Sequence, residues 1–507
     1  MNNKEVNKDK NLIGHCVECK TQTISMKLSI SLFVCALTVI TAFAQNTRPQ
    51  MILKAVDIDE ATIWLAGTGA VTIEWGDGNR DTYNLLPLGK VECSHNYKAV
   101  DNYTLTIAGE NIKYLSCGHN QLTDLDISKN NALSILLCQY NQIKSLDVSA
   151  HPALTELYCR DNPLTTLDVS QNLMLESLHC GYTQLTNLDV SKNLALVELL
   201  CFGNPIGHLD ITHNNALREL NCANSQLAQL DISQNIELEI LVCSGNQLTT
   251  LDISANTGLT ELKCDENRLT QLDVSQNKAL TLLWCTKNQL TTLDVSENMA
   301  LRRLDCYRNG LTLLNLPANA AFMELDCRYN QLTCIDISWS SALKKLVCAH
   351  NQLTSLHWGA STALESLDCE DNRLRTITIP RNTTLTHLNC NNNRLTQLNV
   401  SQCARLRRLT CENNQLTRLD VTKNTTLTYI DCCKNRLAHL DVHKNKALSF
   451  LDCSHNELKQ LDVSKNSTLS HLRCRNNSLK RLDLRQNTKI EYLFSDYNKT
   501  KVLRKKR

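Results

Sequence analysis

The chain has 507 residues, of which 42% are hydrophobic and 5% aromatic, and its 53 Lys and Arg residues nearly balance its 51 Asp and Glu residues. This balance disfavours a protein that electrostatics alone would draw to nucleic acid or to a membrane, and we predict neither partner. The length would allow several domains, but the dominance of leucine among the apolar residues favours one regularly built core. Most of the 25 cysteines recur at one spacing, which argues against a small disulfide-stapled domain.

A candidate export signal lies at residues 26–44, which read MKLSISLFVCALTVITAFA and end in the small-x-small pattern Ala42-Phe43-Ala44. A basic residue, an apolar run and such an ending are typical of a signal peptide, with cleavage here before Gln45. A transmembrane anchor is the alternative, but the run is shorter than the roughly 18 to 20 apolar residues that a span needs. We therefore expect a secreted or cell-surface protein whose mature chain has no stable membrane span.

Residues 1–25 form a polar stretch ahead of this signal. Such a long leader is unusual before a signal peptide, so we interpret it as untranslated sequence or as an extended n-region. Cys16 and Cys19 lie within it and offer only two of the four ligands that a closed zinc site needs. No metal site is predicted there.

Residues 51–112 alternate apolar and polar side chains in short runs that cover residues 61–65, 70–75 and 103–107. This alternation predicts the strands of a small antiparallel β domain. The sequence Gly76-Asp77-Gly78 supplies the positive φ angles that a tight hairpin needs, and Trp75 is the expected core residue beside it.

The same region resembles PKD-like domains through VTIEWGDGNRDTY at 71–83, SHNY at 94–97 and NYTLTI at 102–107. The resemblance implies an Ig-like sandwich without catalytic activity, although the region is short for that family. We expect this domain to act as an N-terminal cap that covers the first unit of the repeats that follow. A spacer or an adhesive module is the alternative.

From Ile112 onward a 21-residue pattern recurs, L-x-C-x-x-N-x-L-x-x-L-D-V/I-S-x-N-x-x-L-x-x. A fixed period of this kind is typical of a solenoid of stacked coils. Each unit holds two copies of one half-motif, so we expect two short extended segments on opposite sides of each coil and little helix. Its 18 cysteines stand at 117, 138, 159, 180, 201, 222, 243, 264, 285, 306, 327, 348, 369, 390, 411, 432, 453 and 474, and the next step reaches Ser495.

This pattern resembles the leucine-rich-repeat family, and within it the 21-residue, cysteine-containing class of secreted proteins from Bacteroides-like bacteria. The resemblance implies a mainly β fold, a leucine-rich-repeat solenoid of 19 coils counted to Ser495, preceded by the small β-sandwich-like domain. We assign residues 113–498 to the solenoid and residues 499–507 to a basic C-terminal tail. At the strand spacing of about 4.8 Å, the stack would be on the order of 90 Å long.

Two polar columns recur in the pattern. Asparagine stands three residues after the cysteine in 17 of 19 units, with Thr183 and Ser225 as exceptions, and its amide can satisfy backbone groups where the chain leaves the strand. Aspartate occupies the L-D-V/I-S segment in 14 of 18 units, starting with Asp126. Asx-type turn bonding is its expected role. A calcium ladder is the alternative, which the missing glycine pattern of calcium-binding loops disfavours.

The cysteine column alternates with outward positions, so its side chains are predicted to point inward as small apolar groups. Disulfides between neighbours are disfavoured because parallel side chains suit the S–S torsion of about 90° poorly, and metal binding is the remaining alternative. Burial would have to shield these thiols in an oxidising environment. The candidates for a reactive thiol are Cys433, at an outward position, and Cys93, Cys334 and Cys403, outside the column.

No catalytic site and no cofactor are predicted. The histidines are scattered, and the sequence contains no GxSxG, HExxH or P-loop motif that would place a nucleophile, a metal or a phosphate.

The residues one position before each cysteine form a candidate ligand-binding surface. These positions face outward, and their residues do not follow the repeat consensus. Up to residue 284 this column is largely apolar or aromatic, and from residue 305 it is largely acidic. A contiguous exposed stripe of this kind is typical of a protein interface. The alternative is that these apolar residues are scattered over the surface without a function. The predicted ligand-binding residues are Leu137, Tyr158, His179, Leu200, Val242 and Trp284 of this column, with Phe202 and Tyr307 just after their cysteines.

A second irregular zone runs through Pro317, Trp339, Trp358 and Pro380, where the L-D-V-S pattern fails. We interpret it as a kink or a second site. The sequence as a whole predicts a non-catalytic, internalin-like recognition or adhesion protein whose partner is a protein or a surface glycan. A structural scaffold or signalling-adaptor rod without a dedicated ligand patch is the alternative.

Overall fold

The computed structural model describes residues 50–504, except 88, 320, 359–362, 380–383 and 497–498. The predicted signal peptide, the Cys16 and Cys19 pair and Pro380 therefore lie outside the described residues. The chain divides into two units, Met1–Thr47 and Arg48–Arg507, and the second contains every element below. Its described residues form strands and turns without a helix, which confirms the mainly β prediction. None of them forms a helix of the length and apolar character needed to cross a membrane.

The N-terminal β unit consists of β1 (Met51–Glu74), β2 (Arg80–Leu85) and β3 (Val91–Ala108). β1 pairs antiparallel with both β2 and β3. The runs at 61–65 and 70–75 belong to this one strand, whereas the sequence predicted two. Between the two runs, the pairing of β1 with β3 shifts its register from Leu65 to Thr72, and β1 pairs with β3 on both sides of this shift.

The predicted hairpin turn joins β1 to β2. Gly76 and Gly78 have φ angles of 87° and 90°, as the turn requires. Trp75 is fully buried, as predicted, and its Nε1 donates a hydrogen bond to Asp81 at 2.7 Å. The Tyr97 hydroxyl donates to the Trp75 carbonyl at 2.9 Å. These contacts fix the tryptophan at the centre of the N-terminal β unit.

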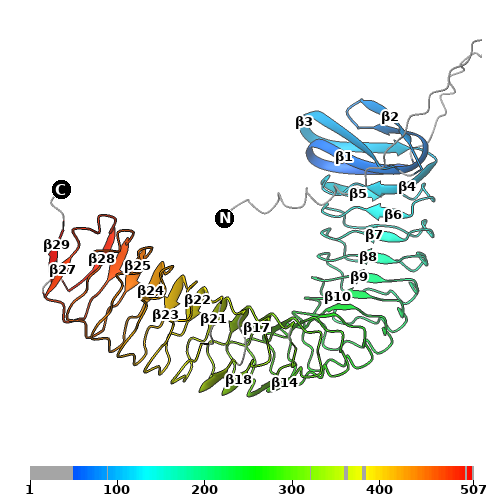
Figure 1. Ribbon diagram of the computed structural model, residues 1–507. Coiled ribbons are helices and arrows are strands. Elements are labelled where there is room, and N and C mark those ends of the chain that lie inside the picture. The colour runs from blue at the N-terminus through cyan, green and yellow to red at the C-terminus, as the bar shows by residue number, and fades with distance from the viewer. Residues whose placement is uncertain are drawn as a thin grey trace, which may run out of the picture. The chain divides into compact units, whose positions relative to one another are not determined.

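Strand β1 also pairs with the first coil of the repeats, through β4 (Asn111–Ser116) and β5 (Leu122–Asp126). Leu65 lies opposite Leu115 in β4, and Leu53 lies opposite Leu125 in β5. At Gly67 the two backbones approach so closely that a Cβ would lie 1.9 Å from the Asn111 carbonyl oxygen. The N-terminal β unit therefore hydrogen-bonds directly to both extended segments of the first coil (Figure 1).

The repeats stack their first extended segments into one parallel sheet, which we call the main sheet (Figure 1). Equivalent residues of successive coils lie opposite one another, as Leu220 does with Leu241, which confirms the 21-residue register. The sheet continues from β4 through β6 (Ile135–Leu137), β7 (Glu156–Tyr158), β8 (Ser177–His179), β9 (Glu198–Leu200), β10 (Glu219–Asn221), β11 (Ile240–Val242), β12 (Glu261–Lys263), β13 (Leu282–Trp284), β15 (Arg303–Asp305), β17 (Glu324–Asp326), β19 (Lys345–Val347), β21 (Ser366–Asp368), β22 (His387–Asn389), β23 (Arg408–Thr410), β24 (Tyr429–Asp431), β25 (Phe450–Asp452), β26 (His471–Arg473) and β28 (Tyr492–Phe494).

The second extended segment of each coil forms regular strands only in places. Besides β5 in the first coil, they are β14 (Thr292–Asp294) with β16 (Leu313–Asn315), β18 (Cys334–Asp336) with β20 (Ser355–His357), and β27 (Arg481–Asp483) with β29 (Lys501–Leu503). Isolated bridges join Asn399, Asp420 and Asp441. The expectation of two extended segments per coil therefore holds fully on the main-sheet side and in part on the other.

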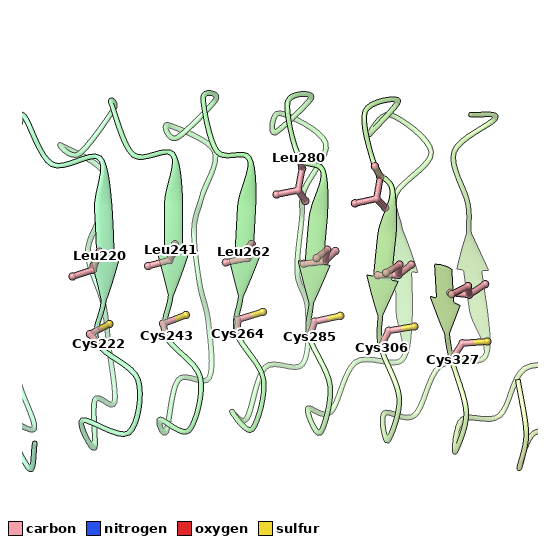
Figure 2. Close-up of a cluster of buried hydrophobic side chains, with 14 of the residues drawn as sticks. Leu220, Cys222, Leu241, Cys243, Leu262, Cys264, Leu280, Cys285, Cys306 and Cys327 are labelled. Atoms are coloured by element: carbon pink, nitrogen blue, oxygen red, sulfur yellow. The ribbon is translucent and has the colours of Figure 1, made fainter. Parts of the chain in front are cut away.

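The core lies between these two sides and is built from columns of identical side chains. Figure 2 shows Leu220, Leu241 and Leu262 stacked on successive strands, with Cys222, Cys243 and Cys264 stacked below them. All of these side chains are fully buried. The predicted inward direction of the cysteine column is confirmed, because the alternation of a strand places residues two apart on the same face.

The irregular zone around Trp339 and Trp358 also belongs to the core. Trp358 is 4% exposed and occupies a valine or isoleucine position of the pattern, and Pro317 is buried. Trp339 is partly buried against Phe322, with ring centroids 6.0 Å apart. Ser340 replaces a pattern asparagine and donates to the Phe322 carbonyl at 3.1 Å. The second-site alternative was wrong for these residues, because they fill the interior or pack against it. The kink alternative stays a prediction.

Candidate ligand-binding face

The asparagine column fixes the turn that follows each main-sheet strand. Asn267 Nδ2 donates to the carbonyls of Cys243 at 3.0 Å and Cys264 at 3.1 Å, and its Oδ1 accepts from the Leu248 N–H at 3.0 Å. Each asparagine thus joins two coils. Thr183 is one of the two residues that replace asparagine in this column, and its hydroxyl donates to Asn204 Oδ1 at 2.6 Å. The predicted structural role of this column is confirmed.

The residue two after each cysteine adopts a left-handed backbone conformation in most coils, with φ of 58° at Tyr140, 54° at Glu266 and 51° at Lys287. L-residues other than glycine adopt this conformation at some cost, and the sequence gives no warning of it because the column holds few glycines. Backbone hydrogen bonds between coils hold it, such as Tyr140 N–H to the Arg160 carbonyl at 3.0 Å. The turn presents the residues after each cysteine on the outer face of the main sheet.

The aspartate column lies on the second extended segment, away from the main sheet. Asp126 Oδ1 accepts the Ser128 N–H at 2.9 Å, and Asp168 accepts the Ser170 N–H at 2.8 Å. Hydrogen bonds from Ser128 lower the pKa of Asp126, and those from Ser170 lower the pKa of Asp168. The predicted Asx-type turn bonding is confirmed, and it explains how closely spaced carboxylates stay ionised.

The column cysteines are free and buried. Burial raises the pKa of Cys117 to about 12 and holds the pKa of Cys138 well above its ordinary value. Cys93, Cys403 and Cys433 are buried too, and Cys334 is exposed. The expectation of four candidate reactive thiols was therefore too broad. A protonated, buried thiol is a poor nucleophile, so Cys334 alone remains among the described cysteines.

We expect a maleimide reagent to label one thiol in the native chain 45–507 and all thiols after denaturation. Intact-mass measurement gives the number of labels. The Cys334→Ser variant should take up no label in the native state, because the other cysteines of that chain are buried. Equal labelling rates at two or more cysteines would contradict the assigned burial.

One group of possible metal ligands occurs among the residues that the structure describes, formed by Glu412, Asp431 and Cys433. Their ligand atoms lie within 4.8 Å of one another, yet Lys434 Nζ already contacts Glu412 Oε1 at 2.9 Å. Burial raises the pKa of Asp431 to about 6 and raises the pKa of the Cys433 thiol. Because Lys434 already engages Glu412 and no further observation points to a bound ion, we assign no metal centre here.

The predicted ligand-binding residues lie on the outer face of the main sheet. Strand pairing brings Leu137 beside Tyr158, Tyr158 beside His179, and His179 beside Leu200. Val242 and Trp284 continue the same column on β11 and β13. Trp284 is 38% exposed, and the others are half-buried by their neighbours. We call this set the apolar stripe.

Several rings of the apolar stripe are already engaged. The Tyr158 and His179 rings stack with centroids 3.8 Å apart, and His179 Nε2 lies 2.9 Å from Glu198 Oε2. Lys263 Nζ lies 4.9 Å from the centroid of the Trp284 ring. Phe202 and Tyr307, just after their cysteines, lie beside the stripe. Phe202 meets Tyr182 edge-on at 5.1 Å, and Arg328 lies 5.0 Å from the Tyr307 centroid.

A second aromatic group on this face was missed from the sequence. Tyr429 stacks on Phe450 at 4.1 Å, and His471 stacks on Tyr492 at 4.5 Å. Tyr429, Phe450 and His471 stand three positions before their cysteines, and Tyr492 stands three before Ser495. In the sequence, only the positions just before and just after each cysteine were followed. The positions three before and one before the cysteine both point outward because they are two apart in a strand, so the signal was present in the sequence.

Comparison with known proteins supports the fold. No family model and no curated protein matches the chain. The functional domain of InlJ from Listeria monocytogenes, described as including a cysteine ladder, is 29% identical, with 74% of each chain covered and a TM-score of 0.52. The LRR protein LIC12759 from Leptospira interrogans is 22% identical, with 69% of this chain and 93% of that chain covered and a TM-score of 0.54. The plant peptide hormone receptor RGFR1 in complex with RGF2 is 17% identical, with 74% and 72% covered and a TM-score of 0.58.

The stacked 21-residue coils and these similarities define the class. The chain has the fold of a leucine-rich-repeat solenoid, mainly β and without helices in the described residues. The cysteine column that the sequence shows has a counterpart in the cysteine ladder of InlJ.

Proposed function

We propose that the chain is an exported, non-catalytic recognition protein that binds a protein ligand on the outer face of the main sheet. The apolar stripe carries this proposal, because strand pairing places its first four members, Leu137 to Leu200, side by side. The same column continues through Asn221 and Lys263 to Val242 and Trp284. The leucine and cysteine columns already fill the interior, so packing does not account for the stripe. Aromatic and aliphatic anchors of this kind dominate the affinity of protein interfaces.

The ring contacts favour a protein ligand over a surface glycan. A glycan that stacks on aromatic side chains needs a free ring face, and His179 covers one face of Tyr158. The similarity to RGFR1, a receptor in complex with a peptide hormone, is consistent with peptide or protein recognition. At 17% sequence identity, the similarity to RGFR1 concerns the fold alone.

The proposal also assigns a role to the N-terminal β unit. We infer that it caps the solenoid, because β1 pairs with β4 and β5 and covers apolar residues of the first coil such as Leu115 and Leu125. An uncovered first coil would expose both its core and its backbone hydrogen-bonding groups.

Alanine substitution tests the apolar stripe. The chain 45–507, immobilised, captures a ligand, and calorimetry then measures its affinity for each variant. We expect Leu200→Ala and Trp284→Ala each to weaken binding by about 2 kcal/mol, roughly 30-fold, while thermal stability stays nearly unchanged. Leu194→Ala is the matched control, since Leu194 is 61% exposed but stands outside the stripe.

Equal losses at Leu200 and Leu194 would contradict the stripe and favour the scaffold alternative, in which no single patch matters. Loss of stability in Trp284→Ala would show that the side chain packs instead of binding. A separate measurement tests export. The mass of the protein recovered from the culture medium should correspond to a chain that starts at Gln45.

A further inference from the structure

A depression of about 390 Å³ lies on the outer face of the main sheet, where the apolar stripe gives way to acidic residues. Its lining includes Asp265, Glu266, Trp284, Asp305 and Tyr307. Trp284 on β13 lies opposite Asp305 on β15. The volume falls in the range of sites that hold small ligands or single side chains.

Two carboxylates of this depression lack a cation. Among the residues that the structure describes, no Lys or Arg nitrogen lies within 4.0 Å of Asp265 or Asp305, since every nearby cation has another partner. Lys263 Nζ lies 3.5 Å from Glu261, Lys287 pairs with Glu266, and Arg328 Nε lies 3.2 Å from Asp326. Arg328 lowers the pKa of Asp305 without forming an ion pair with it, so the negative charge of the depression is compensated only in part.

Asp305 is the less well satisfied of the two. Its Oδ1 is a buried atom without a hydrogen-bond partner, although the Tyr307 backbone N–H lies near enough to lower its pKa. Asp265 accepts hydrogen bonds from the Thr286 N–H at 2.8 Å and the Ser244 hydroxyl at 3.3 Å. Burial, followed by repulsion from Asp326, raises the pKa of Asp305 to about 7. A desolvated carboxylate without a counter-charge reduces stability, and a cationic ligand would offset that cost.

The aromatic walls suit a guanidinium group. Trp284 and Tyr307 line the depression next to the carboxylates. The protein's own arginines already stack on rings of this face, as Arg328 does on Tyr307 at 5.0 Å and Arg408 on Tyr429 at 3.8 Å. A planar guanidinium can lie on a ring while its N–H groups donate to carboxylates, which a compact ammonium does less well.

We propose that this depression binds an arginine side chain of the protein ligand. The guanidinium lies against Trp284 and Tyr307 and donates hydrogen bonds to Asp305 and Asp265. The inference rests on the proposed function, since it names the chemistry of a group that the outer face of the main sheet receives. It also accounts for a carboxylate that costs stability in the unliganded protein.

Capped pentapeptides Gly-Gly-X-Gly-Gly, with X as arginine, lysine or norleucine, provide the probes. Titration calorimetry and saturation-transfer NMR measure their binding to the chain 45–507. We expect the arginine peptide to bind at least tenfold more tightly than the norleucine peptide, and the lysine peptide to bind in between. Equal binding of the arginine and norleucine peptides would overturn the proposal. Lysine binding as tight as arginine would overturn the choice of guanidinium.

Asp305→Asn is the central variant and should weaken binding of the arginine peptide at least tenfold. It should also raise the urea midpoint of unfolding at pH 8, because it removes a desolvated charge, so lost binding cannot reflect unfolding. Asp462→Asn is the matched control, since Asp462 is an exposed member of the aspartate column on the second extended segment. Unchanged peptide binding in Asp305→Asn would refute the assigned site.

The two proposals can fail separately. Leu200 does not line the depression, so Leu200→Ala tests the apolar stripe against the captured ligand and should leave arginine-peptide binding unchanged. Ligand binding that depends on Leu200 but not on Asp305 would refute the arginine site alone. Arginine-peptide binding without any dependence of the captured ligand on Leu200 would refute the apolar stripe as the ligand-binding surface.

Discussion

Replacing Trp75 with alanine should lower the free energy of unfolding of the N-terminal β unit by about 3 to 5 kcal/mol, the loss typical of a buried tryptophan. Trp75 is fully buried, donates to Asp81 at 2.7 Å and stacks on His95 with centroids 5.2 Å apart. Its removal would leave a cavity in the core of the N-terminal β unit, whereas the exposed Asp81 carboxylate could bind water instead. Urea unfolding followed by circular dichroism measures the change.

Trp64→Ala is the matched control on the same strand, because Trp64 is 37% exposed. We expect it to cost about 1 kcal/mol or less, as surface substitutions usually do. If the N-terminal β unit caps the solenoid, Trp75→Ala should also increase hydrogen exchange in β4 and β5, which pair with β1. Unchanged exchange in these strands, with the N-terminal β unit unfolded, would contradict the cap.

Replacing Asn267 with alanine should lower the free energy of unfolding by about 2 to 3 kcal/mol, since buried groups would lose their partners. Its Nδ2 serves the carbonyls of Cys243 and Cys264, and its Oδ1 serves the Leu248 N–H. All of these contacts are buried, so water cannot replace the amide. Urea unfolding and hydrogen exchange at Leu248 measure the loss.

Two controls separate the amide from its surroundings. Asn187→Ala changes an exposed asparagine and should cost about 0.5 kcal/mol or less. Cys264→Ala removes one buried sulfur from the same coil and should cost about 1 kcal/mol, as a small volume loss. A cost for Asn267→Ala no larger than that for Cys264→Ala would show that hydrogen bonding by the column contributes little.

Much of the fold followed from the period alone. The constant spacing of cysteine, asparagine and leucine predicted the parallel register, the inward cysteines and the asparagine bonds between coils, because one coil specifies every other. Prediction failed where the pattern breaks. Trp339 and Trp358 depart from the pattern and were interpreted as part of a kink or a second site, but the coil interior there accommodates larger side chains.

The candidate site was predicted in part. The outward direction of Leu137 and Trp284 follows from strand alternation, and their adjacency follows from the register. Cys433 was expected to be exposed but is only 8% exposed, with Glu412 of the preceding coil and Asp431 of its own coil close to it. Burial of an outward residue depends on the side chains of adjacent coils, which a column followed by itself does not contain.

The sequence by itself determined the coil, its register and the roles of its repeated residues, because these interactions recur between equivalent positions and periodicity reveals them. Only the tertiary structure decided which irregular residues act together. Trp284 and Asp305 share one column in successive coils, and Asp265 stands in another column, just after its cysteine, yet all three line one depression. The register by itself pairs Trp284 with Asp305. The approach of Asp265 to this pair depends on three-dimensional distances that residue spacing does not encode.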